Sequence, residues 1–208
     1  MLPEEMKQII ETTDDANCLM DLAEAALSSG VDEYVDWGEK LFKIALDKTE
    51  DTNSLIGIGI KLARNRWVDL DDHAYDAFSK AADRANNASE LKLTANYIAL
   101  FQVLYDKKWA REVYQMAIEK AECMEDYLEI ADSIAAADFI YDIPWAGELL
   151  RLAIESAVAI DKVPVIIHWI FEEDGSCREE WALPVFEEAV GMTIDEAFKK
   201  YRIMIARY

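Results

Sequence analysis

Few residues of this chain have the types and spacing that catalysis or metal binding requires. The sequence holds only 2 histidines, 3 cysteines and 7 glycines. No Cys-x-x-Cys motif occurs, so the spacing of a zinc site is absent, and no glycine-rich phosphate-binding motif or nucleophile elbow is present. The histidines and cysteines are His73, His168, Cys18, Cys123 and Cys177. We therefore expect no catalytic residues, no metal site and no cofactor, and a protein that is not an enzyme.

The carboxylates also lack a catalytic arrangement. Asp69, Asp71 and Asp72 could attract a hard cation, but the glycine and distal glutamate of a calcium-binding loop are missing. Glu187 and Glu188 are adjacent, so they point to different faces of a helix and cannot flank one substrate bond. The carboxylates are therefore expected to act through their charge.

That charge is large, because 42 acidic residues stand against 21 basic ones and give a net charge of −21. The excess repels nucleic acid. Residues 1–60 and 121–180 carry most of it, and the second segment holds 15 acidic and 3 basic residues, whereas residues 61–120 are nearly balanced. One interpretation of the acidic excess is that it keeps the protein soluble. The other is a docking surface for a basic protein, whose association the charge would accelerate.

The elements that position these charges repeat every 36 residues. Four of the six tryptophans follow this period, with a histidine at the remaining position: Trp37, His73, Trp109, Trp145 and Trp181. A small residue follows each of these positions directly: Gly38, Ala74, Ala110, Ala146 and Ala182. A large apolar residue stands five positions after each: Phe42, Phe78, Tyr114, Leu150 and Phe186. Such columns indicate stacked copies of one supersecondary unit.

A repeat of this length accommodates two amphipathic helices and two short turns. In the best-formed copy we expect helices near 89–103 and 109–121. The predicted repeats are 13–48, 49–84, 85–120, 121–156 and 157–192, all within one domain that spans 1–208. Residues 3–12 and 193–208 are predicted to form capping helices, the second opened by a capping box between Thr193 and Glu196.

The segment Trp109-Ala110-Arg111-Glu112-Val113-Tyr114-Gln115-Met116-Ala117 resembles the tetratricopeptide superfamily in its Trp, Tyr and small residues. The resemblance implies an all-α, right-handed α-solenoid of antiparallel helix pairs, similar to tetratricopeptide and HEAT repeats. It also implies that the first helix of each pair lines the concave side, where a partner would bind.

The candidate binding residues are taken from the outward positions of these first helices. Among Glu125, Asp126, Glu129 and Asp132, the spacing lets three share one exposed helix face. Tyr97 and Trp169 are candidate aromatic anchors, although Trp169 could instead pack against the C-terminal helix. The predicted set from these helices is Asp21, Glu24, Asn96, Tyr97, Glu125, Glu129, Asp132 and Trp169, and the acidic loop expected at 172–176 adds Glu172, Glu173 and Asp174.

In size, charge and architecture the chain resembles the acidic immunity proteins that bacteria pair with secreted toxins, many of which are basic nucleases. The resemblance implies an inhibitor that neutralises a cognate basic toxin domain. The alternative is an adaptor or chaperone that presents a groove to a peptide or effector. Mimicry of nucleic acid is disfavoured, because the balanced segment 61–120 interrupts the acidic charge. The oligomeric state stays open.

We expect a cytoplasmic location and no membrane association. No apolar run approaches the roughly 20 residues that span a bilayer, and Met1-Leu2-Pro3-Glu4-Glu5 lacks the character of a signal peptide. The odd number of dispersed cysteines favours a reducing compartment.

Overall fold

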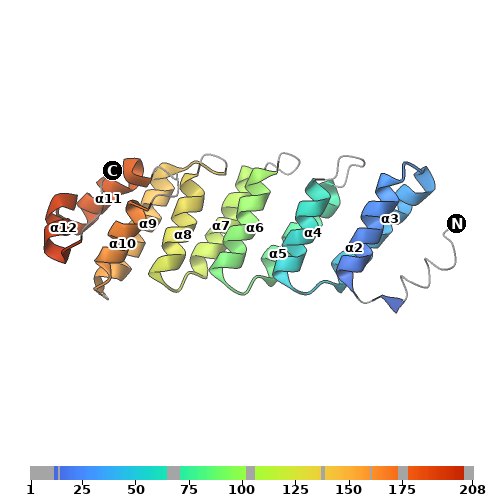
Figure 1. Cartoon of the computed structure of the whole chain (residues 1–208), viewed down its shortest axis with the longest axis horizontal. Coiled ribbons are helices and arrows are strands. Elements are labelled where there is room, and N and C mark those ends of the chain that lie inside the picture. The colour runs from blue at the N-terminus through green and yellow to red at the C-terminus, as the bar shows by residue number, and fades with distance from the viewer. Residues whose placement is uncertain are drawn as a thin grey trace. The chain divides into compact units, whose positions relative to one another are not determined.

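The computed structural model describes residues 12–13, 15–64, 71–101, 106–136, 139–159, 161–172 and 178–203. Every regular element within these ranges is an α-helix (Figure 1), and consecutive helices pack as pairs. This arrangement confirms the predicted all-α fold of stacked helix pairs. The chain divides into two compact units, residues 1–86 with 101–106 (unit 1) and residues 87–100 with 107–208 (unit 2). The expectation of one domain that spans 1–208 stays a prediction.

The described residues of unit 1 form two helix pairs, which fall within the predicted repeats 13–48 and 49–84. Two of the four helices begin at an aspartate whose carboxylate accepts a backbone N–H of the first turn, namely Asp15 from Asn17 and Asp51 from Ser54. The first pair is α2 (Ala16–Ser28) with α3 (Asp32–Lys48), and the second is α4 (Thr52–Ala63) with α5 (Asp71–Arg84).

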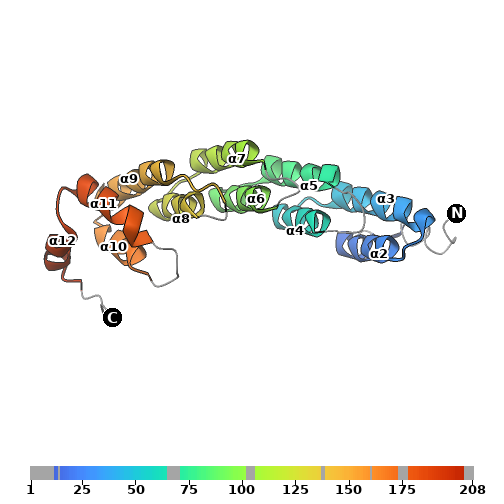
Figure 2. The same ribbon diagram turned by 90° about the horizontal axis from the view of Figure 1, so that it is seen from above.

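In the part of unit 2 that the structure describes, three further pairs are followed by one more helix. The pairs are α6 (Ala88–Leu100) with α7 (Lys107–Glu119), α8 (Met124–Ala135) with α9 (Ile143–Ala159), and α10 (Val163–Ile170) with α11 (Arg178–Val190); α12 (Ile194–Tyr201) follows. Figure 2 shows α6, α8 and α10 along one side of this unit and α7, α9 and α11 along the other. The first helices of the repeats therefore form one layer and the second helices form another.

The 36-residue columns form the core. All five small residues are buried, and the large residues four positions after them are completely buried. The tryptophan column is only half-buried in every repeat. In unit 2, Trp145 packs edge-on against Tyr114, with ring centroids 6.2 Å apart, and also lies beneath the guanidinium of Arg111. The tryptophans thus cover the edges of the core.

Two glycines show why small residues recur between the helices. A Cβ atom at Gly38 would stand 2.6 Å from the side chain of Leu27, and one at Gly59 would stand 2.8 Å from the ring of Phe78. Both distances are shorter than any normal contact, so these helices approach closely only because the positions lack a side chain.

The predicted helix boundaries need correction at three places. In the third repeat, α6 ends at Leu100 rather than near 103, and α7 begins at Lys107, two residues earlier than expected. The capping box at Thr193 and Glu196 is present, but α12 ends at Tyr201 because Arg202 adopts a left-handed conformation with φ of 54°. The expected N-terminal capping helix, except for Thr12, and residues 204–208 lie outside the described residues.

Candidate functional site

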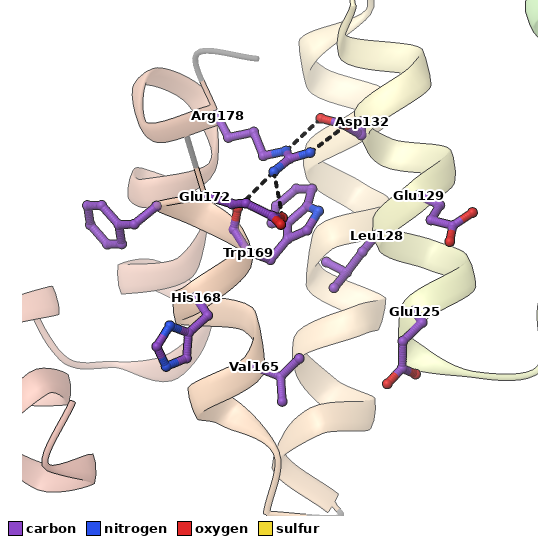
Figure 3. A pocket seen from close by; sticks show the side chains of 10 residues that line it. Glu125, Leu128, Glu129, Asp132, Val165, His168, Trp169, Glu172 and Arg178 are labelled. Atoms are coloured by element: carbon purple, nitrogen blue, oxygen red, sulfur yellow. Dashed lines mark hydrogen bonds and ion pairs between the residues drawn. The ribbon is translucent and has the colours of Figure 1, made fainter. Parts of the chain in front are cut away.

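A pocket of about 590 Å³ lies between α8 and α10 of unit 2. Figure 3 shows Leu128 of α8 and Val165 and Trp169 of α10 turned toward the space between the two helices. Polar side chains surround this apolar centre. The polar lining residues are Glu125, Glu129, Asp132, His168, Glu172 and Arg178, and Phe171 completes the lining.

Arg178, the first residue of α11, closes one end of the pocket. Its side chain is only 6% exposed, and its Nε and Nη2 atoms each donate a hydrogen bond of 2.8 Å to one oxygen of Asp132. The Nη1 atom donates to the backbone carbonyl of Trp169 at 3.1 Å and to the carboxylate of Glu172 at 3.4 Å. The guanidinium also lies over the indole of Trp169, 4.7 Å from the ring centroid. One arginine thus joins α8, α10 and α11.

Each of the three carboxylates of α8 that line the pocket has a cationic partner. Asp132 pairs with Arg178; the other two pairs are Glu129 with Lys92 at 2.5 Å and Glu125 with Lys162 at 3.7 Å. These partners offset the repulsion that like charges on one helix face would cause. A hydrogen bond from its own backbone N–H, with further contributions from Cys123 and Lys162, lowers the pKa of the Glu125 carboxyl.

Comparison of equivalent positions explains why the pocket forms between α8 and α10. Between α6 and α8, Lys92 pairs with Glu129; one repeat later the same two positions are Leu128 and Val165. An ion pair is thus replaced by two apolar side chains, of which Val165 is 40% exposed.

A second pair of positions changes in the same way. Asn96 of α6 donates a hydrogen bond to Ser133 of α8 at 3.3 Å, and it also accepts one from the hydroxyl of Tyr114. One repeat later these two positions are Asp132 and Trp169, whose carboxylate and indole are both bound by Arg178. The arginine therefore takes over the link between neighbouring helices, and the space beside it stays open.

The structure brings five of the predicted site residues together around this pocket: Glu125, Glu129, Asp132, Trp169 and Glu172. Asn96 lies outside it, and Tyr97 on the same helix is half-buried. Asp21 and Glu24 belong to unit 1, where both pair with Lys61 at 3.3 and 3.5 Å. The predicted residues Glu173 and Asp174 lie outside the described residues.

Sequence reasoning missed several lining residues, above all Arg178. A signal for it existed, since it is one of only three basic residues in the acidic segment 121–180. The alternative for Trp169 was packing against the C-terminal helix, but its ring packs edge-on against Trp181 of α11, the preceding helix, with centroids 5.9 Å apart. The indole is nevertheless only partly buried and still lines the pocket.

Within the described ranges, no group of three or more histidine, cysteine, aspartate or glutamate side chains is placed to hold a metal ion. Cys18 and Cys123 are exposed free thiols, and Cys177 lies outside the described residues. In the same part of the chain, no helix combines the length and the apolar character needed to cross a membrane.

Comparisons with known proteins found no match to this chain among protein families, curated proteins or solved structures. Function is therefore inferred from the charge and geometry of the described residues.

Proposed function

We propose that this chain is a non-catalytic, cytoplasmic binding protein that neutralises a basic toxin domain, for example that of a nuclease. It would do so by covering cationic groups of the toxin with its acidic surface. The net charge of −21 supports a basic partner, because such a surface attracts cationic proteins over long distances and repels nucleic acid.

The observation that carries this proposal is the cluster of accessible carboxylates around the pocket. The side chains of Glu125, Glu129 and Glu172 are 51%, 56% and 66% exposed. Their pairs with Lys162 and Lys92 and their neighbour Arg178 do not withdraw them from solvent. Ion pairs at such exposure contribute roughly 0–1 kcal/mol each, so a basic partner can replace or share them at little cost.

Asp132 has a different part in this proposal. Its carboxylate is engaged in both hydrogen bonds with the buried Arg178, so we assign it the task of holding the pocket in shape. Direct contact between Asp132 and a partner stays a prediction from the sequence.

The proposal is tested by capture and by toxicity. The immobilised chain is exposed to a lysate of its source organism at low salt, and bound proteins are eluted with a salt gradient and identified by mass spectrometry. We expect a basic protein that elutes with salt, arrests growth when it is expressed alone, and is harmless when this chain is expressed with it. A captured protein whose toxicity this chain leaves unchanged would contradict the proposal.

The second candidate function is an adaptor or chaperone that holds a peptide. The apolar centre of the pocket favours it, because Leu128, Val165 and Trp169 could receive an apolar side chain of an extended segment. Capture of a set of unrelated proteins, with no dependence on salt, would support this function and would leave the acidic charge as a matter of solubility.

A further inference from the structure

We propose that the pocket between α8 and α10 is a binding site for one long basic side chain, arginine or lysine, presented by the partner. This inference rests on the proposed function and names the chemical group that its site recognises. The occupant's alkyl stem lies against the apolar centre and its charged end lies among the carboxylates.

The apolar centre of the pocket would bind the alkyl stem of the arginine or lysine. Leu128 and Val165 face each other across the space between the helices, and the indole of Trp169 adjoins them (Figure 3). An arginine or lysine carries three or four methylene groups that pack on such surfaces while the charged end stays near solvent. A small cation or a metal ion would leave these side chains without a partner.

The carboxylates around the pocket would bind the positively charged end of the arginine or lysine. The lining residues include four carboxylates, Glu125, Glu129, Asp132 and Glu172, and one guanidinium, that of Arg178. The lining itself is therefore net negative even after Asp132 is matched with Arg178, and the lysines that pair with Glu129 and Glu125, Lys92 and Lys162, lie outside it. Glu125 stands on α8 and Glu172 follows α10, so exposed carboxylates flank the apolar centre from two sides. These carboxylates would repel an anionic occupant and would add nothing to the binding of a neutral one.

The chain's own Arg178 shows that this environment accommodates a guanidinium. Its charged end is held by two carboxylates, Asp132 and Glu172, and by the face of Trp169. Repulsion between Arg178 and a second cation is limited, because the two short hydrogen bonds to Asp132 neutralise Arg178 within the protein. The proposed occupant would therefore make the same kinds of contact, with carboxylates and an indole, that Arg178 already makes.

The test uses the full chain labelled with ¹⁵N and a small probe, N-acetyl-arginine methylamide, in a nuclear magnetic resonance titration at low salt. The matched control probe is the citrulline analogue, which has the same length and shape but no charge. We expect the arginine probe to shift the indole N–H signal of Trp169 and the backbone signals of Val165 and Glu172 in a saturable manner. The citrulline probe should leave them unchanged.

Variants locate the binding. Glu125→Gln and Glu172→Gln should each weaken binding of the arginine probe by up to about fivefold, which corresponds to about 1 kcal/mol for an exposed ion pair. Glu155→Gln, which removes an exposed carboxylate of α9 away from the pocket lining, should leave the affinity unchanged. Equal shifts with both probes, or none at these residues, would overturn the inference.

The titration needs no partner protein, so its outcome is separate from that of the proposed function. If the probe fails to bind while the toxin is still neutralised, only the assignment of the pocket is wrong. If the probe binds in the pocket but no toxin is neutralised, the pocket assignment holds and the inhibitor function is wrong.

Discussion

Arg178 and Asp132 form a two-point ion pair, with both nitrogen–oxygen distances at 2.8 Å, between residues 46 positions apart in the chain. The guanidinium is almost fully buried, whereas the carboxylate retains 30% exposure. The pair connects α8 of one repeat to α11 of the next, so it contributes to the fold of unit 2 as well as to the shape of the pocket.

The variant Asp132→Asn should destabilise the protein by roughly 2–3 kcal/mol, because the buried Arg178 would lose its charged acceptor. The partial exposure of Asp132 keeps the loss below that of a fully buried pair. Urea unfolding followed by circular dichroism measures the change. The double variant Asp132→Asn with Arg178→Met should be less destabilised than the single variant, since no buried charge is left without a partner. A double variant whose loss equals the sum of both single losses would show that the pair does not act as a unit.

The variant Gly59→Ala should destabilise the protein by about 1–3 kcal/mol, although alanine is the better helix former. The added Cβ would stand 2.8–3.0 Å from three atoms of the buried Phe78 ring. Gly57, on the same helix, is the matched control, because a Cβ there meets nothing within 4 Å. Gly57→Ala should stabilise by about 0.5–1 kcal/mol. Equal effects of the two substitutions on the urea midpoint would refute the close approach of α4 and α5.

The columns of small and large residues that recur every 36 positions explain why the fold was predictable from the sequence. Buried small and large residues recur at fixed spacing, and each copy adds the same information about helix faces. The tryptophans at the edge of the core, such as Trp145, supplied the period although they are only half-buried. Helix ends were less predictable. They depend on local backbone conformation. Arg202, for example, is left-handed, whereas the positions 36 and 72 residues before it are helical.

The variant Tyr114→Phe should cost about 1 kcal/mol, because the completely buried hydroxyl donates a hydrogen bond to Asn96. Burial also raises the pKa of Tyr114, so its hydroxyl stays protonated in the folded protein at a pH where exposed tyrosines ionise. Tyr141→Phe, at a residue that is 64% exposed, serves as the control and should change the free energy of unfolding by less than about 0.5 kcal/mol. If Tyr114→Phe is equally neutral, Asn96 is not held by this contact and is available to a partner.

Asp142 should contribute stability that depends on pH. A hydrogen bond from Arg111, followed by the backbone N–H of Trp145, lowers the pKa of its carboxyl. A lowered pKa means that the contribution is complete above the unfolded value of about 3.9 and is lost as the pH falls through the folded value. Asp142→Asn should therefore be less stable than the parent at pH 7, and the difference should shrink below about pH 4.

Urea midpoints measured from pH 7 to pH 3 test this expectation. Glu112→Gln, which removes an exposed carboxylate from a loose contact with Lys108 at 3.8 Å, is the control for a general effect of charge. A difference for Asp142→Asn that is constant across this range, or that grows toward low pH, would contradict the assignment.

The candidate site was predictable only in part. The period and the charge of α8 drew attention to Glu125 and Glu129, which line the pocket, because repeat position and acidity are both visible in the sequence. Arg178 was not found, because it belongs to none of the 36-residue columns. Its partner Asp132 lies 46 positions away, a separation that the repeat period does not predict. The replacement of Lys92 and Glu129 by Leu128 and Val165 was visible in the sequence, but its meaning required the knowledge that these positions face each other.

The recurrence of equivalent contacts in neighbouring repeats has a consequence for how the chain can change in length. A duplicated copy of residues 85–120, inserted after the original, would meet α8 with the same small and large columns that α6 and α7 already present. Growth by whole repeats is therefore compatible with the core at this point. It is not compatible after residue 156, because an added pair there would separate Asp132 from Arg178 and break the link that closes the pocket.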